Sequence, residues 1–417
     1  MNILFLTLLD FDNLESQNIY TDLLRKFYCE GHCVSIISPV ERKKKMGTQF
    51  LKLDNRLNIL KLKIGNIQKT NIIEKGISTV ILESIFVAAI KKYYGAITFD
   101  LVLYATPPIT LQKAVNYIKK RDHAVTYLML KDIFPQNAVD MGMLSKHGGK
   151  KLLYSYFRRK ERLLYRDSDY IGCMSSANVE YIRKHNSQIE PDRIGLCPNC
   201  IEPVCHNINT AQKNEIRKKL GLPEGKLLFV YGGNLGRPQG IPFLIDCLKR
   251  VGENQNAYFL IVGNGTEYGN LETFIEQENP QNVRLLPALP KSEYESMILA
   301  ADVGMIFLDH RFTIPNFPSR LLSYMQAKIP VLAVTDPNTD IGKVIVGGGF
   351  GWWCESNHIE EFARNVERAQ EADLNGMGEK AYAYMMEHYT AGHVYQLIMN
   401  KVNKEQIWNS YSDIQKK

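Results

Sequence analysis

The sequence has few of the features that mark secreted, membrane-spanning or nucleic-acid-binding proteins. Its apolar start, residues 3–9, has no basic segment before it and runs directly into Asp10, so a cleavable signal is not indicated. The longest apolar run, residues 78–90, contains Glu83 and is shorter than the roughly 20 residues that a membrane-spanning helix needs. Basic tails, zinc-finger spacings and the aromatic motifs of RNA-binding domains are also missing, which argues against nucleic acid as a partner. We expect a protein that is soluble or peripheral to a membrane.

Disulfide and metal-site patterns are missing as well. The eight cysteines are scattered over the chain and do not form the framework of a small secreted domain. Cys197 and Cys200, with Cys205 after them, could be read as zinc ligands or a redox pair. No second pair stands at finger spacing, however, and the residues between them, Pro198 and Asn199, fit a turn. The two Asp-x-Asp sequences, at 10–12 and 167–169, are interpreted as chance, so we expect no metal site.

Length and charge indicate two domains with different surroundings. A chain of 417 residues is too long for one small core, and two α/β domains of ordinary size are expected. Residues 1–204 hold 30 Lys and Arg against 20 Asp and Glu, whereas residues 205–417 hold 21 against 24. The first half therefore carries +10 and the second −3, so only the first half is expected to face an anionic partner such as a membrane surface.

In the first half, apolar runs alternate with helical patterns. Strands are predicted at 2–9, 33–38, 101–105 and 124–130, with a helix at 17–30, which is typical of a parallel sheet. The basic stretch 41–75 is interpreted as a solvated loop region. In parallel sheets ligands bind outside the carboxyl ends of the strands. The loops at 10–17, at Thr106 and at Asp132 are therefore expected to form the floor of a cleft.

A basic amphipathic helix is predicted at 148–166. It holds seven Lys and Arg against Glu161, and Leu153, Tyr156, Phe157 and Leu164 lie near one stripe. Such a helix can lie on a membrane, or it can pack on a core with a wet basic face. Both interpretations stay open, and the charge of the first half favours the membrane.

The second half repeats the strand-and-helix pattern after a linker at 202–210. Strands are predicted at 227–231, 258–262, 283–286 and 303–308, each followed by small or turn residues. The first is followed by the glycine-rich turn 232–240, which contains Arg237 and opens a helix at Ile241. Glycines let the backbone approach a phosphate and Arg can bind it, although the spacing matches neither Walker A nor the dinucleotide fingerprint. We expect a nucleotide cleft at these strand ends.

The stretch 309–336 organises the second half. It reads as a Pro-rich loop, a helix that begins at Pro318-Ser319-Arg320, and a buried strand at 331–334. A free helix N-terminus beside a loop of backbone amides is an anion site, usually for phosphate. Taken alone, the stretch could also be an ordinary α/β unit without a ligand.

In order along the chain, these motifs resemble those of a known enzyme family. They are Thr106-Pro107-Pro108, Asp132-Ile133-Phe134-Pro135, Pro198-Asn199, Gly233-Asn234-Leu235-Gly236-Arg237, Gly263-Asn264-Gly265, Pro318-Ser319-Arg320 through Pro330-Val331, and the glycines at 347–351. The set resembles the retaining family 4 glycosyltransferases of bacterial O-antigen, capsule and colanic-acid synthesis. The resemblance implies the GT-B architecture: two Rossmann-like α/β domains with parallel sheets that face each other across a cleft.

The resemblance also implies a reaction. We expect transfer of a sugar, an N-acetylated hexosamine or deoxyhexosamine, from a UDP-linked donor to a polyprenyl-diphosphate-linked glycan. It would proceed with retention, without a metal or other cofactor, at the cytoplasmic face of the cell membrane. Residues 1–204 would bind the acceptor and residues 205–384 the donor, and a helical tail at 385–417 would cross back to the first domain.

The site residues follow from the same resemblance. On the donor side it implies Gly233, Asn234, Gly236, Arg237, Gly263, Asn264, Gly265, Ala288, Leu289, Phe317, Pro318, Ser319, Arg320 and Ser323. On the acceptor side we expect Asp10, Asn13, Gln17, Thr106 and Asp132. Arg237 and Arg320 would neutralise the donor phosphates, and Asp132 is the candidate polar contact or base. Arg and backbone N–H groups can stabilise a leaving group without metal, and in a front-face transfer the departing phosphate can itself accept the proton.

The sequence departs from the family pattern at three positions. The two glutamates usually found eight positions apart are replaced by Pro315 and Ser323, and the lysine two residues after Arg237 is replaced by Gln239. Two alternatives therefore stay open: an isomerase similar to the GT-B sugar-nucleotide 2-epimerases, and a non-catalytic partner of a glycosyltransferase.

Overall fold

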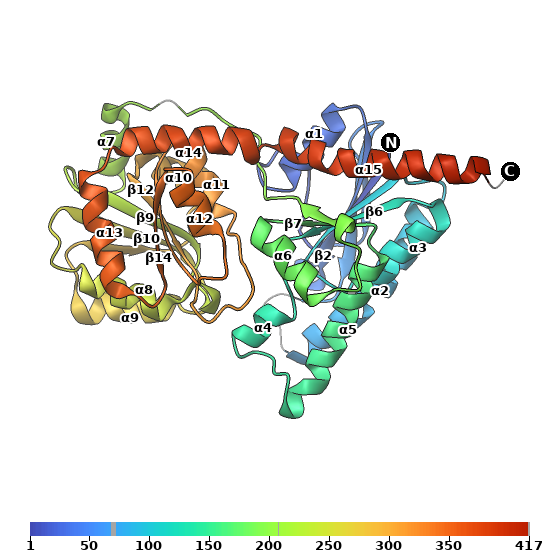
Figure 1. The fold of residues 1–417 in the computed structure, drawn as a ribbon, viewed down its shortest axis with the longest axis horizontal. Helices are drawn as coiled ribbons and strands as arrows, with labels where there is room; N and C mark the ends of the chain where they lie inside the picture. Colours follow the sequence, from blue (N-terminus) through green and yellow to red (C-terminus); the bar gives the residue numbers. More distant parts are fainter. Residues whose placement is uncertain (68–71, 207, 416–417) are drawn as a thin grey trace. The chain divides into compact units, whose positions relative to one another are not determined.

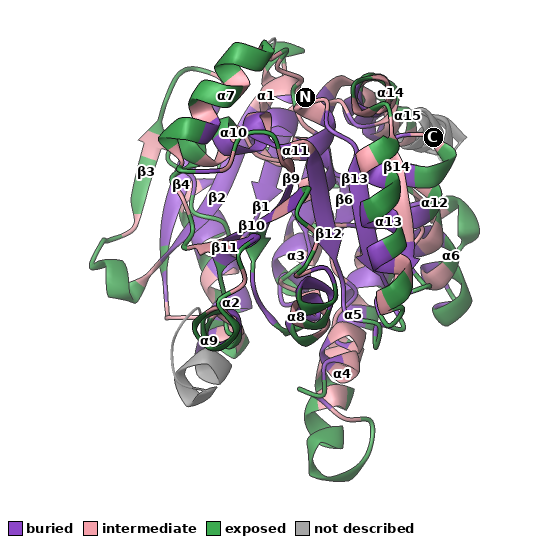
Figure 2. Cartoon of the chain, turned by 90° about the vertical axis from the view of Figure 1, so that its left-hand side faces the viewer, coloured by how far each residue is buried: buried purple, intermediate pink, exposed green. Residues whose placement is uncertain are grey.

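The chain forms two compact units in a computed structural model that describes residues 1–67, 72–206 and 208–415, without the side chains of 72–77 and 404–415. The first unit comprises Met1–Glu202 together with Ala391–Lys417, and the second comprises Pro203–Thr390 (Figure 1). Each unit is built on one sheet, and the strands of both sheets are largely buried beneath helices with exposed outer faces (Figure 2).

The first unit has an eight-stranded sheet in the order β3-β4-β2-β1-β5-β6-β7-β8. The strands are β1 (Asn2–Leu6), β2 (Cys33–Glu41), β3 (Gln49–Lys52), β4 (Leu57–Ile64), β5 (Leu101–Ala105), β6 (Val125–Leu130), β7 (Tyr170–Cys173) and β8 (Ile194–Leu196). Its helices are α1 (Thr21–Cys29), α2 (Ile72–Tyr93), α3 (Gln112–Asp122), α4 (Gln136–Asp140), α5 (Lys151–Asp167), α6 (Ser176–His185) and α15 (Ala391–Gln415). All neighbouring strands are parallel except β3 and β4, so the predicted parallel α/β fold is confirmed.

The prediction of a solvated loop at 41–75 is wrong, because this stretch contains β3 and β4. Strand β4 pairs in parallel with β2, and its apolar residues are buried. The strand was not predicted because it contains Lys61 and Lys63, and lysine is seldom buried. The side chain of Lys61 is only 2% exposed, and its ammonium group donates to the Phe11 carbonyl and to the carboxylates of Asp10 and Asp12.

The last helix, α15, packs on α1 and completes the core of the first unit. The ring of Tyr395 lies edge-on to Phe27, with 4.8 Å between ring centroids, and its hydroxyl is 3.0 Å from Nε2 of His32. The backbone N–H of Ala391 donates to the carbonyl of Ile201, 3.0 Å away. The chain therefore leaves the first unit and returns to it at neighbouring points.

The second unit has a six-stranded parallel sheet in the order β11-β10-β9-β12-β13-β14. The strands are β9 (Leu227–Asn234), β10 (Ala257–Asn264), β11 (Val283–Leu286), β12 (Val303–Phe307), β13 (Val331–Thr335) and β14 (Gly351–Glu355). Its helices are α7 (Thr210–Lys219), α8 (Ile241–Arg250), α9 (Tyr268–Glu278), α10 (Lys291–Ala300), α11 (Arg320–Gln326), α12 (Ile341–Gly347), α13 (Ile359–Glu371) and α14 (Leu374–His388).

Helices cover both faces of this sheet. Side chains from α8, α9 and α13 share one core cluster with Phe229, Tyr231 and Phe307. On the strand positions of opposite parity, Gly232 and Gly304 leave room for the rings of Tyr294 in α10 and Tyr324 in α11. Because successive side chains of a strand point to opposite faces, α10 and α11 lie on the face opposite to α8 and α13.

The order of strands reverses between β9 and β12. Strand β9 continues through α8 to β10, and β12 continues through α11 to β13 on the other side. The pairing of these two strands comprises Val303↔Phe229 and Gly304↔Val230, at the start of β12. The carboxyl ends of β9 and β12 therefore flank a topological switch point, the place where open α/β sheets bind ligands.

Candidate functional site

Arg320 lies at the switch point of the second unit. Its Cζ is 4.4 Å from the centroid of the Tyr231 ring, and its Nη2 lies 3.3 Å from the place that a Cβ on Gly233 would take. Among the described residues, its buried Nη1 has no hydrogen-bond partner. A buried N–H group is costly to leave unpaired, so this guanidinium is poised to bind an anion.

Tyr324 fixes the start of α11 over the switch point. Its hydroxyl donates to the carbonyl of Met305 in β12 at 3.0 Å, and the carbonyl of Val230 in β9 lies 3.3 Å away. Its ring fills the space above Gly304, where a Cβ would come within 2.4 Å of it. The helix that carries Arg320 is thus anchored to both strands.

The expected helix start at Pro318 lies two residues too early. Helix α11 begins at Arg320, with Ser319 as an N-cap residue whose side chain makes no capping bond. The helix has only seven residues, so its dipole offers little to an anion and Arg320 supplies the charge. The Phe317 ring is buried against Tyr389, with 6.1 Å between centroids, whereas Ser319 is exposed and Pro318 and Ser323 are half-buried.

The glycine-rich turn after β9 is held by Gln239. The Oε1 of Gln239 accepts from Nδ2 of Asn234 at 3.1 Å and from the N–H of Gly236 at 3.2 Å. Gly233 has a φ of +128°, a conformation that side chains rarely adopt, and lies directly against Arg320. The residue that replaces the family's usual lysine therefore shapes this turn.

Arg237, in the same turn, is exposed and lies near a carboxylate. Its side chain is 65% exposed, and Nε lies 3.6 Å from Oε1 of Glu267. Its expected role at the donor phosphates stays a prediction.

The ends of β9, β10 and β11 contact one another. A Cβ on Gly263 would lie 1.8 Å from the carbonyl oxygen of Gly233, so only glycine permits this approach. Likewise a Cβ on Gly265 would lie 2.2 Å from the carbonyl oxygen of Leu235. The N–H of Ala288 donates to Oδ1 of Asn264 at 3.3 Å, and Leu289 follows half-buried. The structure thus brings most of the predicted donor residues to one edge of the sheet.

Asp336, at the end of β13, was missed by sequence reasoning. Burial raises the pKa of Asp336 to about 6, against backbone hydrogen bonds from Asn338 and Thr339 that lower it. Asn338 donates to the carbonyl of Phe312 at 2.6 Å, and Thr339 to that of Asn316. The Asp336 turn therefore braces the loop before α11, and its only signal in the sequence was a carboxylate directly after a buried strand.

In the first unit, Thr106 and Asp132 lie together at the carboxyl ends of neighbouring strands β5 and β6. The Oγ1 of Thr106 donates to the carbonyl of Asp132 at 3.1 Å and accepts from the N–H groups of Lys131 and Asp132. Both carboxylate oxygens of Asp132 accept from Nδ2 of Asn137 at 2.7 Å. Burial raises the pKa of Asp132 to about 6, although Ile133 and Asn137 lower it through hydrogen bonds.

The loop after β1 lies beside these two, since β1 pairs with β5. The carboxylate of Asp10 binds the ammonium groups of Lys61 and Lys44; burial opposes its ionisation, but the two lysines outweigh this and lower its pKa. Oδ1 of Asn13 accepts from the N–H of Glu15 at 3.0 Å, and Gln17 is half-buried. The engagement of Asp10 by two lysines was not expected from the sequence.

Within the described part of the chain, no cluster of three or more His, Cys, Asp or Glu side chains is arranged to hold a metal ion. The thiols of Cys197 and Cys200 are free and buried in the core of the first unit. No described helix has the length and apolar character to span a membrane.

Two units built on mainly parallel, Rossmann-like sheets, the second with the Arg320 guanidinium at its switch point, have the GT-B architecture. Residues 212–384 match the family model described as "Glycosyl transferases group 1". The chain thus contains a group 1 glycosyltransferase domain, and the predicted class of enzyme is confirmed.

Relatives of known name agree with this class. The chain is 24% identical to the probable glycosyltransferase WbjE of Pseudomonas aeruginosa, over 77% of this chain and 78% of that one. It is 20% identical to the putative colanic acid biosynthesis glycosyl transferase WcaI of Escherichia coli, over 65% of this chain and 66% of that one.

Solved structures share the fold over almost the whole chain. The sucrose-phosphate synthase of Thermosynechococcus elongatus superposes with a TM-score of 0.75 at 13% identity, over 98% of this chain and 100% of that one. HepE of Anabaena, solved in complex with UDP, superposes with a TM-score of 0.67 at 14% identity, over 97% and 100%.

Proposed function

We propose that this enzyme transfers a sugar from a UDP-linked donor to a polyprenyl-diphosphate-linked glycan during synthesis of a surface polysaccharide. The observation that carries the donor half of the proposal is the buried Nη1 of Arg320 at the switch point, for which the described residues provide no hydrogen-bond partner. A relative named for colanic acid synthesis and a structural neighbour that binds UDP support the choice of substrates.

Arg320 would act on the leaving group. Cleavage of the bond between sugar and diphosphate leaves extra negative charge on the terminal phosphate, and a pre-positioned guanidinium stabilises that charge more in the transition state than in the substrate. The Gly236 N–H of the neighbouring turn already donates to Gln239, so the charge comes from the guanidinium. Because a guanidinium can supply the positive charge that a divalent ion supplies elsewhere, we propose that the reaction needs no metal.

Asp132 would act on the acceptor. With a pKa near 6, its carboxylate is ionised at neutral pH and can accept a hydrogen bond from the attacking hydroxyl. In a front-face retaining transfer the departing phosphate oxygen can take the proton, so Asp132 would orient the hydroxyl or share this role.

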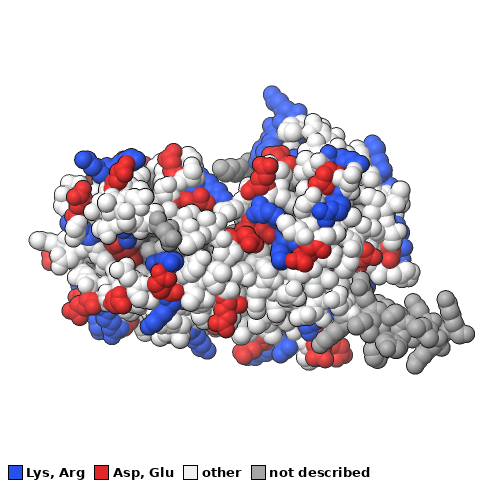
Figure 3. All heavy atoms as spheres, turned by 90° about the horizontal axis from the view of Figure 1, so that it is seen from above, with Lys and Arg blue, Asp and Glu red and all other residues white. Residues whose placement is uncertain are grey.

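Helix α5 and the loop before it offer a surface for the membrane that would carry the acceptor. Leu152 is 83% exposed, and Leu153, Met143 and Tyr156 are exposed as well. Lysines at 146, 150 and 151 stand among them. Exposed apolar side chains within a basic segment favour the anionic cytoplasmic leaflet, so we propose a peripheral position there. On the face shown in Figure 3, by contrast, basic and acidic side chains of the described residues are interspersed.

The proposal is tested by incubating the full chain with a panel of UDP- and GDP-sugars and a polyprenyl-diphosphate-linked glycan. We expect UDP release that requires the acceptor, persists in EDTA and yields a product with the anomeric configuration of the donor. UDP-sugar conversion without acceptor would indicate an isomerase instead, and donor binding without turnover a non-catalytic partner. Loss of activity in EDTA would overturn the metal-independent part.

A further inference from the structure

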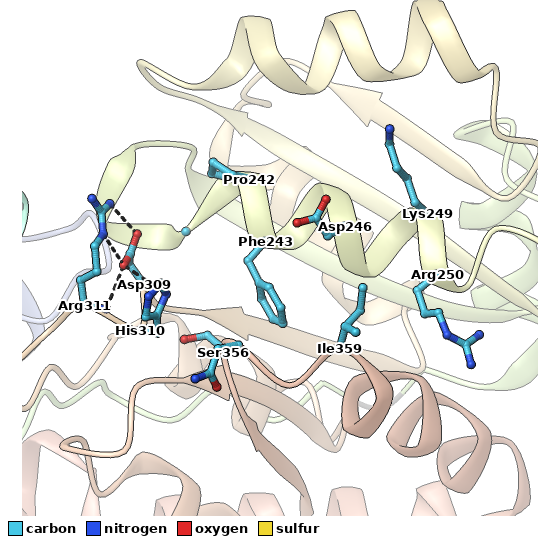
Figure 4. A pocket seen from close by; sticks show the side chains of 12 residues that line it. Pro242, Phe243, Asp246, Lys249, Arg250, Asp309, His310, Arg311, Ser356 and Ile359 are labelled. Atoms are coloured by element: carbon cyan, nitrogen blue, oxygen red, sulfur yellow. Dashed lines mark hydrogen bonds and ion pairs between the residues drawn. The ribbon is translucent and has the colours of Figure 1, made fainter.

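A cavity lies in the second unit, between α8, residues 309–311 and the start of α13 (Figure 4). Its volume is about 1000 Å³, enough for one or two sugar rings. Phe243 stands out from α8 toward Ser356 and Ile359, with His310 and Arg311 at one end and Asp246 beside it (Figure 4). None of the individually predicted donor residues lies in its wall, although Gly240 ends the glycine-rich turn and residues 309–311 begin the stretch 309–336.

This cavity is distinct from the Arg320 site. Helices α8 and α13 cover one face of the sheet, and their apolar side chains share a core cluster. The guanidinium of Arg320 lies against Tyr231 and Gly233, and none of these three residues lines the cavity. A ligand in the cavity would therefore leave the Arg320 site free.

The charges in the wall argue against an anionic ligand. Each of the three cations is already paired with a carboxylate: Arg311 with Asp309 (Nη2–Oδ2 2.8 Å and Nε–Oδ1 2.9 Å), Arg250 with Glu360 (2.8 and 2.9 Å), and Lys249 with Glu278 (2.9 Å). Asp246 adds a further negative charge. A phosphate or carboxylate would have to compete with the carboxylate of one of these pairs, whereas a neutral polar ligand leaves all three pairs intact.

The remaining groups fit a sugar ring. Phe243 is half-buried and flanked by Pro242 and Ile359, so it forms an apolar platform. The C–H face of a pyranose packs well on the electron-rich face of an aromatic ring. The hydroxyl of Ser356, a residue only 2% exposed, has no hydrogen-bond partner within the described chain, and the amide of Asn357 is exposed beside it. Planar polar side chains around an apolar platform suit the hydroxyl rim of a sugar.

We propose that this cavity is a second carbohydrate site, which binds a neutral sugar residue of a glycan at the same time as the donor occupies the Arg320 site. This inference depends on the proposed function in one respect only: the glycan would be the polysaccharide that the enzyme extends.

The test uses the full chain, saturated with UDP so that the donor site is filled, and saturation-transfer NMR. The probes are neutral monosaccharides and their short oligomers, with glucuronate and inorganic phosphate for comparison. We expect neutral sugars to bind despite UDP, and Phe243→Ala to weaken this binding by about fivefold, as expected for loss of one ring contact. Phe243→Tyr should restore it.

Controls separate binding from folding. Tyr382 is a half-buried aromatic residue on α14 and lies outside the cavity wall, so Tyr382→Ala should leave sugar binding unchanged. Asn357→Ala and Asp246→Ala change exposed residues and should weaken binding without affecting the fold. Absence of UDP-insensitive sugar binding, tighter binding of phosphate or glucuronate, or full binding by all three cavity variants would overturn the inference. UDP release with a short acceptor is measured on the same samples. This readout tests the proposed function, whereas sugar binding in the presence of UDP tests the second site.

Discussion

The guanidinium of Arg320 stacks on the ring of Tyr231, with its Cζ 4.4 Å from the ring centroid. This contact joins the first residue of α11 to the strand on the other side of the switch point. The aromatic ring offers the cation a favourable surface without neutralising it, as a carboxylate would. The positive charge therefore stays available to a ligand.

We predict that Arg320→Ala lowers kcat by about 100- to 1000-fold, the cost of removing one donor to a developing oxyanion. Arg320→Lys should recover only part of this, because it keeps the charge and loses the two-point geometry. Steady-state UDP release measures both. Arg368, an exposed arginine paired with Glu361 on α13, gives the matched control Arg368→Ala, for which we expect no change. An unimpaired Arg320→Ala enzyme would exclude the proposed role.

Arg237→Ala tests whether the exposed arginine of the glycine-rich turn also binds the diphosphate. If it does, kcat/KM should fall, and the fall should correspond to the loss of a few kcal/mol of transition-state stabilisation. The effect would then be similar to that of Arg320→Ala. Since its nearest charged partner is Glu267, Glu267→Gln should free Arg237 and leave activity intact or higher. Wild-type kinetics for Arg237→Ala would assign the diphosphate to Arg320 alone.

The raised pKa of Asp132 predicts two opposite effects of pH. A carboxyl whose folded pKa is about 6, above the unfolded value of 3.8, stabilises the fold at low pH, and this contribution is lost as pH rises from about 4 through 6. Asp132→Asn should therefore be more stable than wild type at pH 8, by about 1–3 kcal/mol in urea unfolding. Activity of the wild type should instead rise through pH 6 as the carboxylate forms, and Asp132→Asn should lose this rise. A wild-type profile flat from pH 5 to 8 would contradict the role.

Lys61 makes a prediction about stability alone. Lys61→Met leaves the carboxylates of Asp10 and Asp12 without their buried counter-ion, and should lower the free energy of unfolding by about 1–3 kcal/mol. Lys44 also binds Asp10, but its side chain is 52% exposed, so Lys44→Met should cost no more than about 1 kcal/mol. Equal effects of the two substitutions would show that burial of Lys61 is unimportant.

The exposed leucines of α5 test the membrane surface. Leu152→Asp with Leu153→Asp should lower binding to vesicles of phosphatidylglycerol at least about tenfold, because two apolar side chains lose their burial in the interface. Val346 is 55% exposed on α12 in the second unit, and Val346→Asp is the matched control. Binding that is weak to neutral phosphatidylcholine and falls with salt is expected. Co-sedimentation that the double substitution leaves unchanged would rule out this surface.

Sequence reasoning located the strands that are continuous apolar runs, such as β5 and β12, because burial on both faces leaves little else at these positions. It missed β4, where Lys61 is buried through partners that are remote in sequence. It also selected Arg320 but not its contact with Tyr231, since that contact arises from the meeting of β9 and α11. Asp336 was missed for the same reason: its pKa depends on burial, which is a property of the folded chain.

The return of α15 to the first unit makes that unit discontinuous in sequence. Its core includes Val394, Ile398 and Val402, which are synthesised after the whole of the second unit. During translation the first unit therefore cannot complete its core until the second has been made, whereas the second is one uninterrupted segment and can fold earlier. The unit proposed to bind the donor would thus be finished before the one proposed to hold the acceptor.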